Sequence, residues 1–332
     1  MMLNIMPIVN RRSILSILLV AVFVTGCTKK NEKLADQNVR PPSVIRFANI
    51  GGTNLPLNFG LKKGFFAEQG IDLKIVSLPS GPACVTAAAS GEADLGVVGS
   101  PILVGIAAGV PITIVASPPH AGENFLLISK PQYKSFAELK GKAVSPGNVG
   151  GGSSDAFLMI AKAKGFKSSD FQLVNSGASA NSLAALQTGR VEAIIASEVV
   201  GVKAELEGFG KILEHAVDYF GHYQHSFVFA TNSFIKEKPE AVRAFLVAYR
   251  KTLEYIKAHP EEAIQFAVTD LQQEERSYRK VYEKEIPTWD TSGKIDFVGT
   301  DNAIKILKEL GDINPQVQIT AKKIVDERFL TK

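Results

Sequence analysis

The chain has 332 residues, of which 45% are hydrophobic and 21% are charged, a composition typical of folded globular proteins and not of disordered or fibrous ones. At this length we expect two compact parts, because one hydrophobic core rarely grows so large. Arg11, Arg12 and the basic excess of residues 27–40 account for the whole formal charge of +4. The neutral remainder argues against nucleic-acid binding, which requires a basic face.

The first 26 residues predict a secretory signal peptide. Arg11 and Arg12 precede an apolar run from Ile14 to Val24, which at about 11 residues is too short to span a membrane. Val24-Thr25-Gly26-Cys27 resembles the lipobox of bacterial lipoproteins, in which the cysteine is lipidated. An ordinary cleaved signal with a coincidental cysteine is the alternative. The lipobox predicts a membrane anchor at Cys27 on the periplasmic or extracellular face, followed by a polar tether up to residue 42.

From residue 44 onward, short apolar runs alternate with amphipathic stretches, which is typical of βα units around mostly parallel sheets. A first series predicts strands over 44–49, 73–78, 94–98 and 112–116, with helices over 55–63, 81–90 and 101–108. A second series predicts strands over 125–129, 142–145, 171–175 and 193–196, with helices over 154–164 and 181–188. Residues 241–258 have apolar side chains at helical spacing and predict an amphipathic helix. Two α/β series in one chain predict two lobes.

Several stretches resemble one family when taken in order. They are GLKKGFFAEQGIDLKIVSLPSG, AAASGEADLGVVGSP and IAAGVPITIVA in the first series, then SFAELKGKAVSPGNVGGGSSDAFLMIAKAKGF and LAALQTGRVEAIIASE in the second. Together they are similar to the nitrate, sulfonate and taurine type of binding proteins, which includes the SsuA and THI5-like proteins and serves ABC importers. The similarity extends from about residue 44 to about residue 268, and it depends on the order and spacing of the stretches.

This resemblance implies a two-lobed α/β fold of the periplasmic-binding-protein type II, with a mostly parallel sheet in each lobe. Lobe 1 is then discontinuous, with residues 43–121 and 226–332, and lobe 2 is residues 122–225. The implied function is the capture of a sulfonate, taurine, nitrate or pyrimidine-like molecule by closure of the lobes, and its delivery to permease and ATPase subunits. A monomer without catalytic residues, cofactor or metal is expected.

Ligands of open parallel sheets bind at the carboxyl ends of the strands, where loops lead into helices. Glycines in such loops permit close approach of a ligand to the backbone, and small polar side chains supply hydrogen bonds. The candidate ligand-binding residues of lobe 1 are Gly52, Thr53, Asn54, Ser80, Gly81 and Ser100. Those of lobe 2 are Gly152, Ser153, Ser154, Ser176 and Glu198.

The charge of the ligand stays open. NVGGGSSD leads into a helix whose free N–H groups favour an anion. Asp155 opposes this hypothesis, because a carboxylate in the first helical turn satisfies those groups and repels an anion. Glu198 is either a partner for an amine group or a solvated carboxylate at a helix start.

Other residues and functions also have two interpretations. His222 and His225 have the spacing of a metal pair, but no third ligand accompanies them, so polar contacts at the hinge are favoured. Trp289 either closes over the cleft or covers the C-terminal part of lobe 1. A biosynthetic enzyme with the same fold, or a binding partner of a sensor, remains the alternative to transport.

Overall fold

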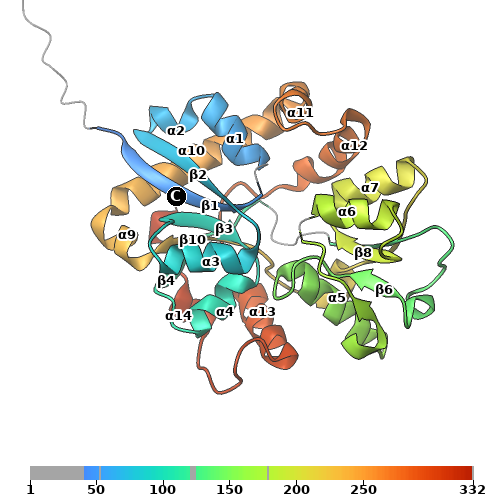
Figure 1. Ribbon diagram of the computed structural model, residues 1–332. Coiled ribbons are helices and arrows are strands. Elements are labelled where there is room, and N and C mark those ends of the chain that lie inside the picture. Colours follow the sequence, from blue (N-terminus) through green and yellow to red (C-terminus); the bar gives the residue numbers. More distant parts are fainter. Residues whose placement is uncertain (1–40, 52–53, 120–124, 178, 331–332) are drawn as a thin grey trace, which may run out of the picture. The chain divides into compact units, whose positions relative to one another are not determined.

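The structure is a computed structural model that describes residues 41–51, 54–119, 125–177 and 179–330, and it contains two five-stranded sheets (Figure 1). Sheet A has the strand order β2-β1-β3-β10-β4, and sheet B has the order β7-β6-β8-β5-β9. The strands of sheet A are β1 (Ser43–Ile50), β2 (Ile71–Leu78), β3 (Leu95–Val98), β4 (Ile112–Ala116) and β10 (Phe227–Thr231). Those of sheet B are β5 (Leu126–Ser129), β6 (Ala143–Ser145), β7 (Gln172–Leu173), β8 (Ala193–Ala196) and β9 (Lys211–His215).

Helices surround both sheets (Figure 1). The helices before β5 are α1 (Leu55–Lys62), α2 (Phe65–Glu68), α3 (Gly81–Ala89) and α4 (Pro101–Ala107). Between β5 and β10 lie α5 (Gly152–Ala163), α6 (Ser179–Gln187), α7 (Glu198–Leu206) and α8 (Val217–Phe220). After β10 follow α9 (Asn232–Glu237), α10 (Pro239–Ala258), α11 (Pro260–Thr269), α12 (Glu275–Glu285), α13 (Phe297–Leu310) and α14 (Ala321–Ile324). Short 3-10 turns comprise Phe136–Leu139, Ser168–Asp170, Ile286–Thr288 and Glu327–Phe329.

The sheets are mostly parallel, as predicted. In sheet A, β1 pairs in parallel with β2 and β3, whereas β10 lies antiparallel between β3 and β4. In sheet B, β6 pairs in parallel with β7 and β8, whereas β5 lies antiparallel between β8 and β9. Each sheet therefore has one strand that runs against the other four.

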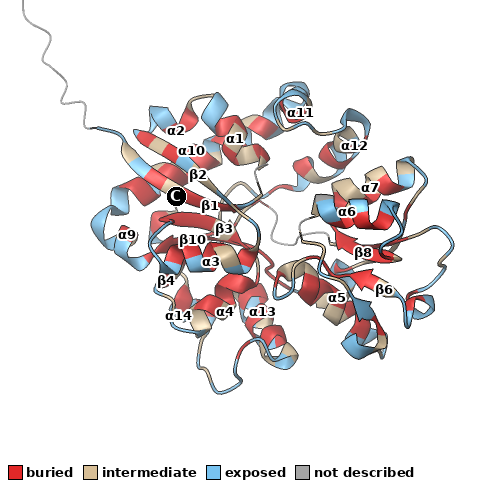
Figure 2. Cartoon of the chain, in the orientation of Figure 1, coloured by how far each residue is buried: buried red, intermediate tan, exposed pale blue. Residues whose placement is uncertain are grey.

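The two reversed strands are buried on both faces, because their side chains alternate between two hydrophobic clusters (Figure 2). On β10, Val228 and Ala230 pack with α1 and α10, while Phe227 and Phe229 pack with α3, α4 and α13. On β5, Leu127 packs with α5, and the flanking Leu126 and Ile128 pack with the helices on the opposite face. The helices cover the sheets with apolar faces and expose their outer faces to solvent (Figure 2).

The predicted strands and helices all occur, with ends shifted by a few residues. The strands predicted over 112–116 and 193–196 have those same limits, and the strand predicted over 171–175 shortens to Gln172–Leu173. Strands β9 and β10 are additional to the prediction, whose second series ends with the strand over 193–196. The sequence places a chain crossing near residues 223–227, and because β10 begins at Phe227, the last residue of that segment belongs to sheet A.

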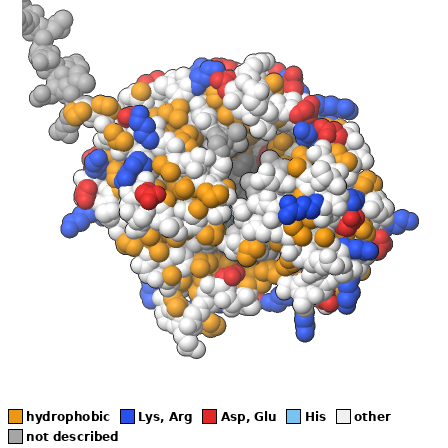
Figure 3. Space-filling model, viewed as in Figure 1, with side chains coloured by type: hydrophobic (Ala, Val, Ile, Leu, Met, Phe, Trp, Pro, Cys, Tyr) orange, Lys and Arg blue, Asp and Glu red, His pale blue; other side chains and the backbone are white. Residues whose placement is uncertain are grey.

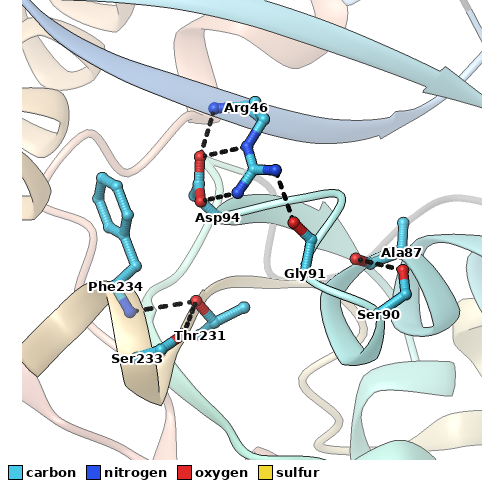
Figure 4. Close-up of polar contacts among 8 residues, drawn as sticks. All are labelled: Arg46, Ala87, Ser90, Gly91, Asp94, Thr231, Ser233 and Phe234. Atoms are coloured by element: carbon cyan, nitrogen blue, oxygen red, sulfur yellow. Dashed lines mark hydrogen bonds and ion pairs between the residues drawn. The ribbon is translucent and has the colours of Figure 1, made fainter.

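An ion pair between Arg46 and Asp94 joins β1 to the start of β3 (Figure 4). The carboxylate of Asp94 accepts hydrogen bonds from the backbone N of Arg46 (2.8 Å) and from its Nε (3.0 Å). The guanidinium of Arg46 also donates to the carbonyl oxygen of Gly91 (2.6 Å). On the other side, the backbone N of Thr231 donates to the carbonyl oxygen of Asp94 (2.9 Å). Asp94 therefore joins β1, β3 and β10.

The predicted leader lies outside the described residues, as do Cys27 and residues 120–124. Within the described ranges, no helix combines the length and apolar character needed to cross a membrane. The limits of the two lobes stay a prediction, although the strand orders show that the chain leaves sheet A after β4 and returns to it at β10.

Replacement of Asp94 by Ala is expected to lower the free energy of unfolding by about 1–3 kcal/mol, because the backbone N–H of Arg46 loses its acceptor. Urea denaturation followed by circular dichroism measures this change. Asp72→Ala is the matched control: its carboxylate pairs with Lys74 (2.8 Å) at a site where 37% of the aspartate side chain is exposed, so a change below about 0.5 kcal/mol is expected. Equal losses of unfolding free energy in Asp94→Ala and Asp72→Ala would contradict the role of Asp94 in joining β1 to β3.

Candidate ligand-binding site

A cavity of about 340 Å³ lies at the carboxyl ends of β1 and β3 in sheet A and next to the segment that follows β4. This is the edge at which ligands bind to parallel sheets. The described residues that line it are Asn49, Ile50, Asn54, Leu55, Pro56, Val97, Val98, Gly99, Pro118, Pro119, Ser226, Tyr249 and Trp289. None of these residues carries a charged side chain.

Asn54 is a sequence-predicted candidate in this wall. Its Oδ1 accepts a hydrogen bond from the backbone N of Leu57 (3.1 Å), which caps the start of α1. Its Nδ2 donates to Oδ1 of Asn49 (3.1 Å). The Nδ2 of Asn49 in turn donates to the carbonyl oxygens of Ile50 (3.2 Å) and Gly51 (3.0 Å). The two amides therefore bond mainly to the protein itself and hold the shape of the wall.

The other lobe 1 candidates lie elsewhere or outside the described residues. Gly52 and Thr53 belong to the residues that the structure does not describe. Ser80 caps α3, because its Oγ accepts from the backbone N of Ala83 (3.3 Å). Gly81 lies so close to α4 that an added Cβ would come within 2.7 Å of Cγ of Pro101. In the structure, Ser80 and Gly81 therefore shape the α3–α4 contact and are absent from the described lining of the cavity.

Tyr249 and Trp289 form the aromatic part of the lining. Tyr249 comes from α10, and burial raises the pKa of its hydroxyl far above the ordinary value. Trp289 is 6% exposed and belongs to the core cluster that covers one face of sheet A, while its carbonyl oxygen accepts from Nζ of Lys257 (2.6 Å). Trp289 lines the cavity and packs in the core cluster on sheet A, whereas its closure over a cleft stays a prediction. In the sequence, Tyr249 is marked only by its place on the apolar side of a helix.

The candidates on sheet B gather around the start of α5 and the end of β6. Gly152, Ser153 and Ser154 form the first turn of α5. Ser153 packs against Gly147, where an added Cβ would lie 2.4 Å from its Oγ. The hydroxyl of Ser176 contacts Oγ of Ser145 and lies 2.7 Å from Oγ of Ser182. These hydroxyls form a short chain of hydrogen bonds at the carboxyl end of β6.

Glu198 is buried, with 6% of its side chain exposed, and its carboxylate forms an ion pair with Nζ of Lys284 on α12. The interpretation of Glu198 as a solvated carboxylate is therefore wrong. Because Lys284 follows β10 in the chain, this ion pair joins α7 of sheet B to a helix of the C-terminal part. An amine on a ligand would have to compete with that lysine.

Three further contacts join sheet B to sheet A. Ser100, at the start of α4, donates through Oγ to Oδ2 of Asp155 on α5. Nδ2 of Asn148 donates to the carbonyl oxygen of Pro79 (3.2 Å). On the periphery, Nζ of Lys162 pairs with Glu309 of α13 (2.9 Å).

His225 fills the space between two glycines, one from each sheet. An added Cβ on Gly99 would lie 2.9 Å from Cε1 of His225, and one on Gly152 would lie 2.4 Å from its Nε2. Its Nδ1 lies 3.1 Å from Oγ of Ser226, and the ring packs edge-on against Phe125. Since Gly99 and Ser226 also line the cavity, the cavity adjoins the contact between the sheets.

The two histidines do not form a metal pair. His222 contacts the carboxylate of Asp296 through Nε2, whereas His225 contacts Ser226. Among the described residues, no group of three or more His, Cys, Asp or Glu side chains is arranged to hold a metal ion. Lys, Arg, Asp and Glu side chains are interspersed over the face seen in Figure 3. The contacts of both histidines are polar, and their place at a hinge stays a prediction.

The two sheets, the reversed strand in each and the strand-end cavity define the fold of periplasmic binding proteins. The alkanesulfonate-binding protein SsuA from Xanthomonas axonopodis pv. citri, bound to MOPS, has this fold. It superposes with a TM-score of 0.71 at 16% identity, over 86% of this chain and 98% of that one. The predicted fold class is confirmed.

The chain belongs to the NMT1/THI5-like family, whose sequence profile matches residues 54–263. One relative is the 4-amino-5-hydroxymethyl-2-methylpyrimidine phosphate synthase THI12 of Saccharomyces cerevisiae, 30% identical over 228 residues. That alignment covers 63% of this chain and spans 65% of the length of the yeast protein. Another is the formylaminopyrimidine-binding protein of Halalkalibacterium halodurans, 24% identical over 283 residues, with 82% of each chain covered.

Replacement of Asn54 by Ala is expected to lower the free energy of unfolding by about 1 kcal/mol, because α1 loses its N-cap. Asn54→Ser is the matched variant, since serine retains a capping oxygen but loses the hydrogen bond to Asn49. We expect Asn54→Ser to recover most of the stability in thermal unfolding. If both variants unfold at the same temperature as the unchanged protein, the cap does not stabilise α1.

Proposed function

We propose that the chain is the extracytoplasmic solute-binding component of an ABC importer. The cavity at the strand ends of sheet A adjoins the contact with sheet B, so a bound molecule is positioned to favour approach of the two sheets. Membership of the NMT1/THI5-like family and similarity to a protein named as a binding protein support this function. In this proposal, permease and ATPase subunits receive the molecule.

The observation that carries the choice of ligand is the uncharged lining of the cavity. Its described residues offer amide, hydroxyl and aromatic groups without a lysine, arginine or carboxylate. A sulfonate or nitrate would require cationic or free N–H donors. A flat, neutral heterocycle fits better, because it can stack on Trp289 or Tyr249 and bury its faces against apolar walls. We therefore favour a pyrimidine-like ligand, in agreement with the names of the two relatives.

The proposal includes the division into lobes. Lobe 1 comprises residues 43–121 and 226–332, and lobe 2 comprises residues 122–225, with the hinge where the chain crosses between sheets A and B. The membership of β10 in sheet A supports this division. In this arrangement, Ser100–Asp155, Asn148–Pro79 and Lys284–Glu198 are contacts of a closed form.

An anchored, exported protein completes the proposal. Residues 1–26 are then removed, lipid on Cys27 holds the chain at a membrane surface, and residues 27–42 serve as the tether. The charge and apolar pattern of the leader supports export, and multiple acyl chains would provide stable attachment.

An enzyme of pyrimidine synthesis is the second candidate function, because the yeast relatives are named as synthases. It shares the proposed ligand class and differs in whether the bound molecule is changed. Mass spectrometry of the ligand after incubation with the protein separates the two, since a binding protein returns it unaltered.

The ligand is tested by thermal unfolding in the presence of a formylaminopyrimidine, 4-amino-5-hydroxymethyl-2-methylpyrimidine, taurine, an alkanesulfonate or nitrate. A pyrimidine at 100 times its Kd is expected to add about 2.7 kcal/mol of stability. Trp289→Ala should weaken pyrimidine binding at least about tenfold, and Trp289→Phe should retain most of it because a ring remains for stacking. Stabilisation by a sulfonate or nitrate alone would contradict the ligand class.

The anchor is tested with Cys27→Ser, which removes the only thiol that the lipobox can acylate. The variant is expected in the soluble fraction after cell lysis, while its affinity for the ligand stays within about twofold because the polar composition of the tether predicts no part in ligand binding. Cys84→Ser serves as the control, since Cys84 is buried in α3. A Cys27→Ser protein that still sediments with membranes would contradict lipidation.

A further inference from the structure

The contact between Ser100 and Asp155 joins buried polar groups of two different sheets. Ser100 is 2% exposed and Asp155 is 3% exposed, and 55 residues separate them in the sequence. Asp155 lies in the first turn of α5, where its carboxylate is expected to satisfy the N–H groups of its own helix. The structure gives it the hydroxyl of Ser100 as a partner instead.

Residues next to Asp155 also form contacts between the sheet B part and the sheet A part of the chain. Gly152, one turn before Asp155, lies against the ring of His225. Asn148, in the loop before α5, donates to the carbonyl oxygen of Pro79. The start of α5, a helix that packs on sheet B, therefore contacts segments of sheet A beside the cavity.

We propose that Asp155 and Ser100 are positioning residues that make lobe closure, and with it ligand capture, dependent on protonation of Asp155. This inference rests on the proposed hinge closure and deepens it. In the open form Asp155 faces solvent and ionises as an ordinary carboxyl group. Closure buries it against α4, and burial disfavours the charged form.

The groups around Asp155 leave it without a cationic partner on the elements described. The pKa of Asp155 is raised to about 7, chiefly by burial and also by the charge of Asp312 beyond α13, while the hydrogen bond from Ser100 opposes the rise. His225 lies on the returning segment; its Nε2 is 2.4 Å from the position of a Cβ on Gly152, and its Nδ1 contacts Ser226.

The elements of sheet B that pack on α5 add little charge. β8 consists of Ala193–Ala196 and has no titratable side chain. On α8, Asp218 is exposed, and the hydroxyl of Tyr219 is engaged by Glu214. Lys162, two turns further along α5, pairs with Glu309.

The direction of the pH effect follows from these pKa values. In the open form the carboxyl group has its ordinary pKa near 4, and in the closed form the pKa is about 7. Closure therefore takes up a proton between these values. The closed form is fully favoured at low pH and becomes progressively less favoured as the pH rises through 7.

The test compares the unchanged protein with Asp155→Asn, Ser100→Ala and Asp218→Asn between pH 5.5 and 8.5. Affinity for a formylaminopyrimidine is measured by calorimetry in two buffers that differ in ionisation enthalpy, so that proton uptake is read directly. The unchanged protein and Asp218→Asn are expected to bind on the order of tenfold more tightly at pH 5.5 than at 8.5 and to take up protons. Asp155→Asn should bind equally at both pH values and take up none.

Ser100→Ala provides a second readout. It is expected to shift the midpoint of the pH dependence, whereas Asp155→Asn is expected to abolish the pH dependence. Loss of the donor that favours the ionised carboxylate should move the pH midpoint upward, a shift that a merely structural role would not produce. Small-angle scattering of each ligand-free protein measures closure without a ligand: the radius of gyration of the unchanged protein should decrease as the pH falls, and that of Asp155→Asn should not change.

Each outcome decides one of the two proposals. Failure of every pyrimidine to bind, together with pH-dependent scattering that Asp155→Asn abolishes, would refute the ligand class and support the role of Asp155. Identical pH dependence of the unchanged protein and Asp155→Asn in both measurements overturns the role of Asp155. The Ser100→Ala midpoint decides in the same way if Asp155→Asn does not fold.

Discussion

The organisation of the molecule depends on two short strands that run against their neighbours. β10 enters sheet A between β3 and β4, and β5 enters sheet B between β8 and β9. Their side chains enter a different hydrophobic cluster on each face, so each reversed strand holds both layers of its sheet together. Because β10 follows the whole of sheet B in the chain, sheet A can be completed only by a segment that returns from sheet B.

This constraint also places the candidate site. The returning segment carries His225 and Ser226 immediately before β10, beside Gly99 at the end of β3. The cavity therefore forms where the chain passes between the sheets. Its asparagines bond mainly to each other and to the backbone, so its shape is held by the protein. Its aromatic side chains come from α10 and from the segment before α13, far away in the sequence.

The sequence predicted what depends on local pattern. The strands of both series are recognisable as apolar runs within repeated βα units, and the helix over residues 241–258 is recognisable by its apolar spacing. The cap at Asn54 is not part of the prediction, although an asparagine before Leu55-Pro56 is a helix-start signal. The strand β10 is also absent from the prediction, because it follows a chain crossing and only the fold shows which sheet it joins.

Contacts between residues far apart in the sequence could not be predicted from local sequence pattern. Asp155 was expected to act on the N–H groups of its own helix, and only the packing of α5 against α4 gives it Ser100. Glu198 was weighed as a solvated or ligand-binding carboxylate, and Lys284, 86 positions later, is its partner. Tyr249 and Trp289 reach the cavity through the fold of the C-terminal part. Each depends on tertiary contacts that local propensity does not encode.

The late position of β10 also governs how the chain can acquire its structure. Leu95 pairs with Ala230, so the centre of sheet A closes only after more than a hundred intervening residues have been synthesised. Contacts of such long sequence separation form slowly, because loop closure must precede them. During synthesis, β3 and β4 are therefore made before β10, the strand that pairs with both of them. The N-terminal strands of sheet A therefore gain their full set of strand pairs only after most of the chain has been made.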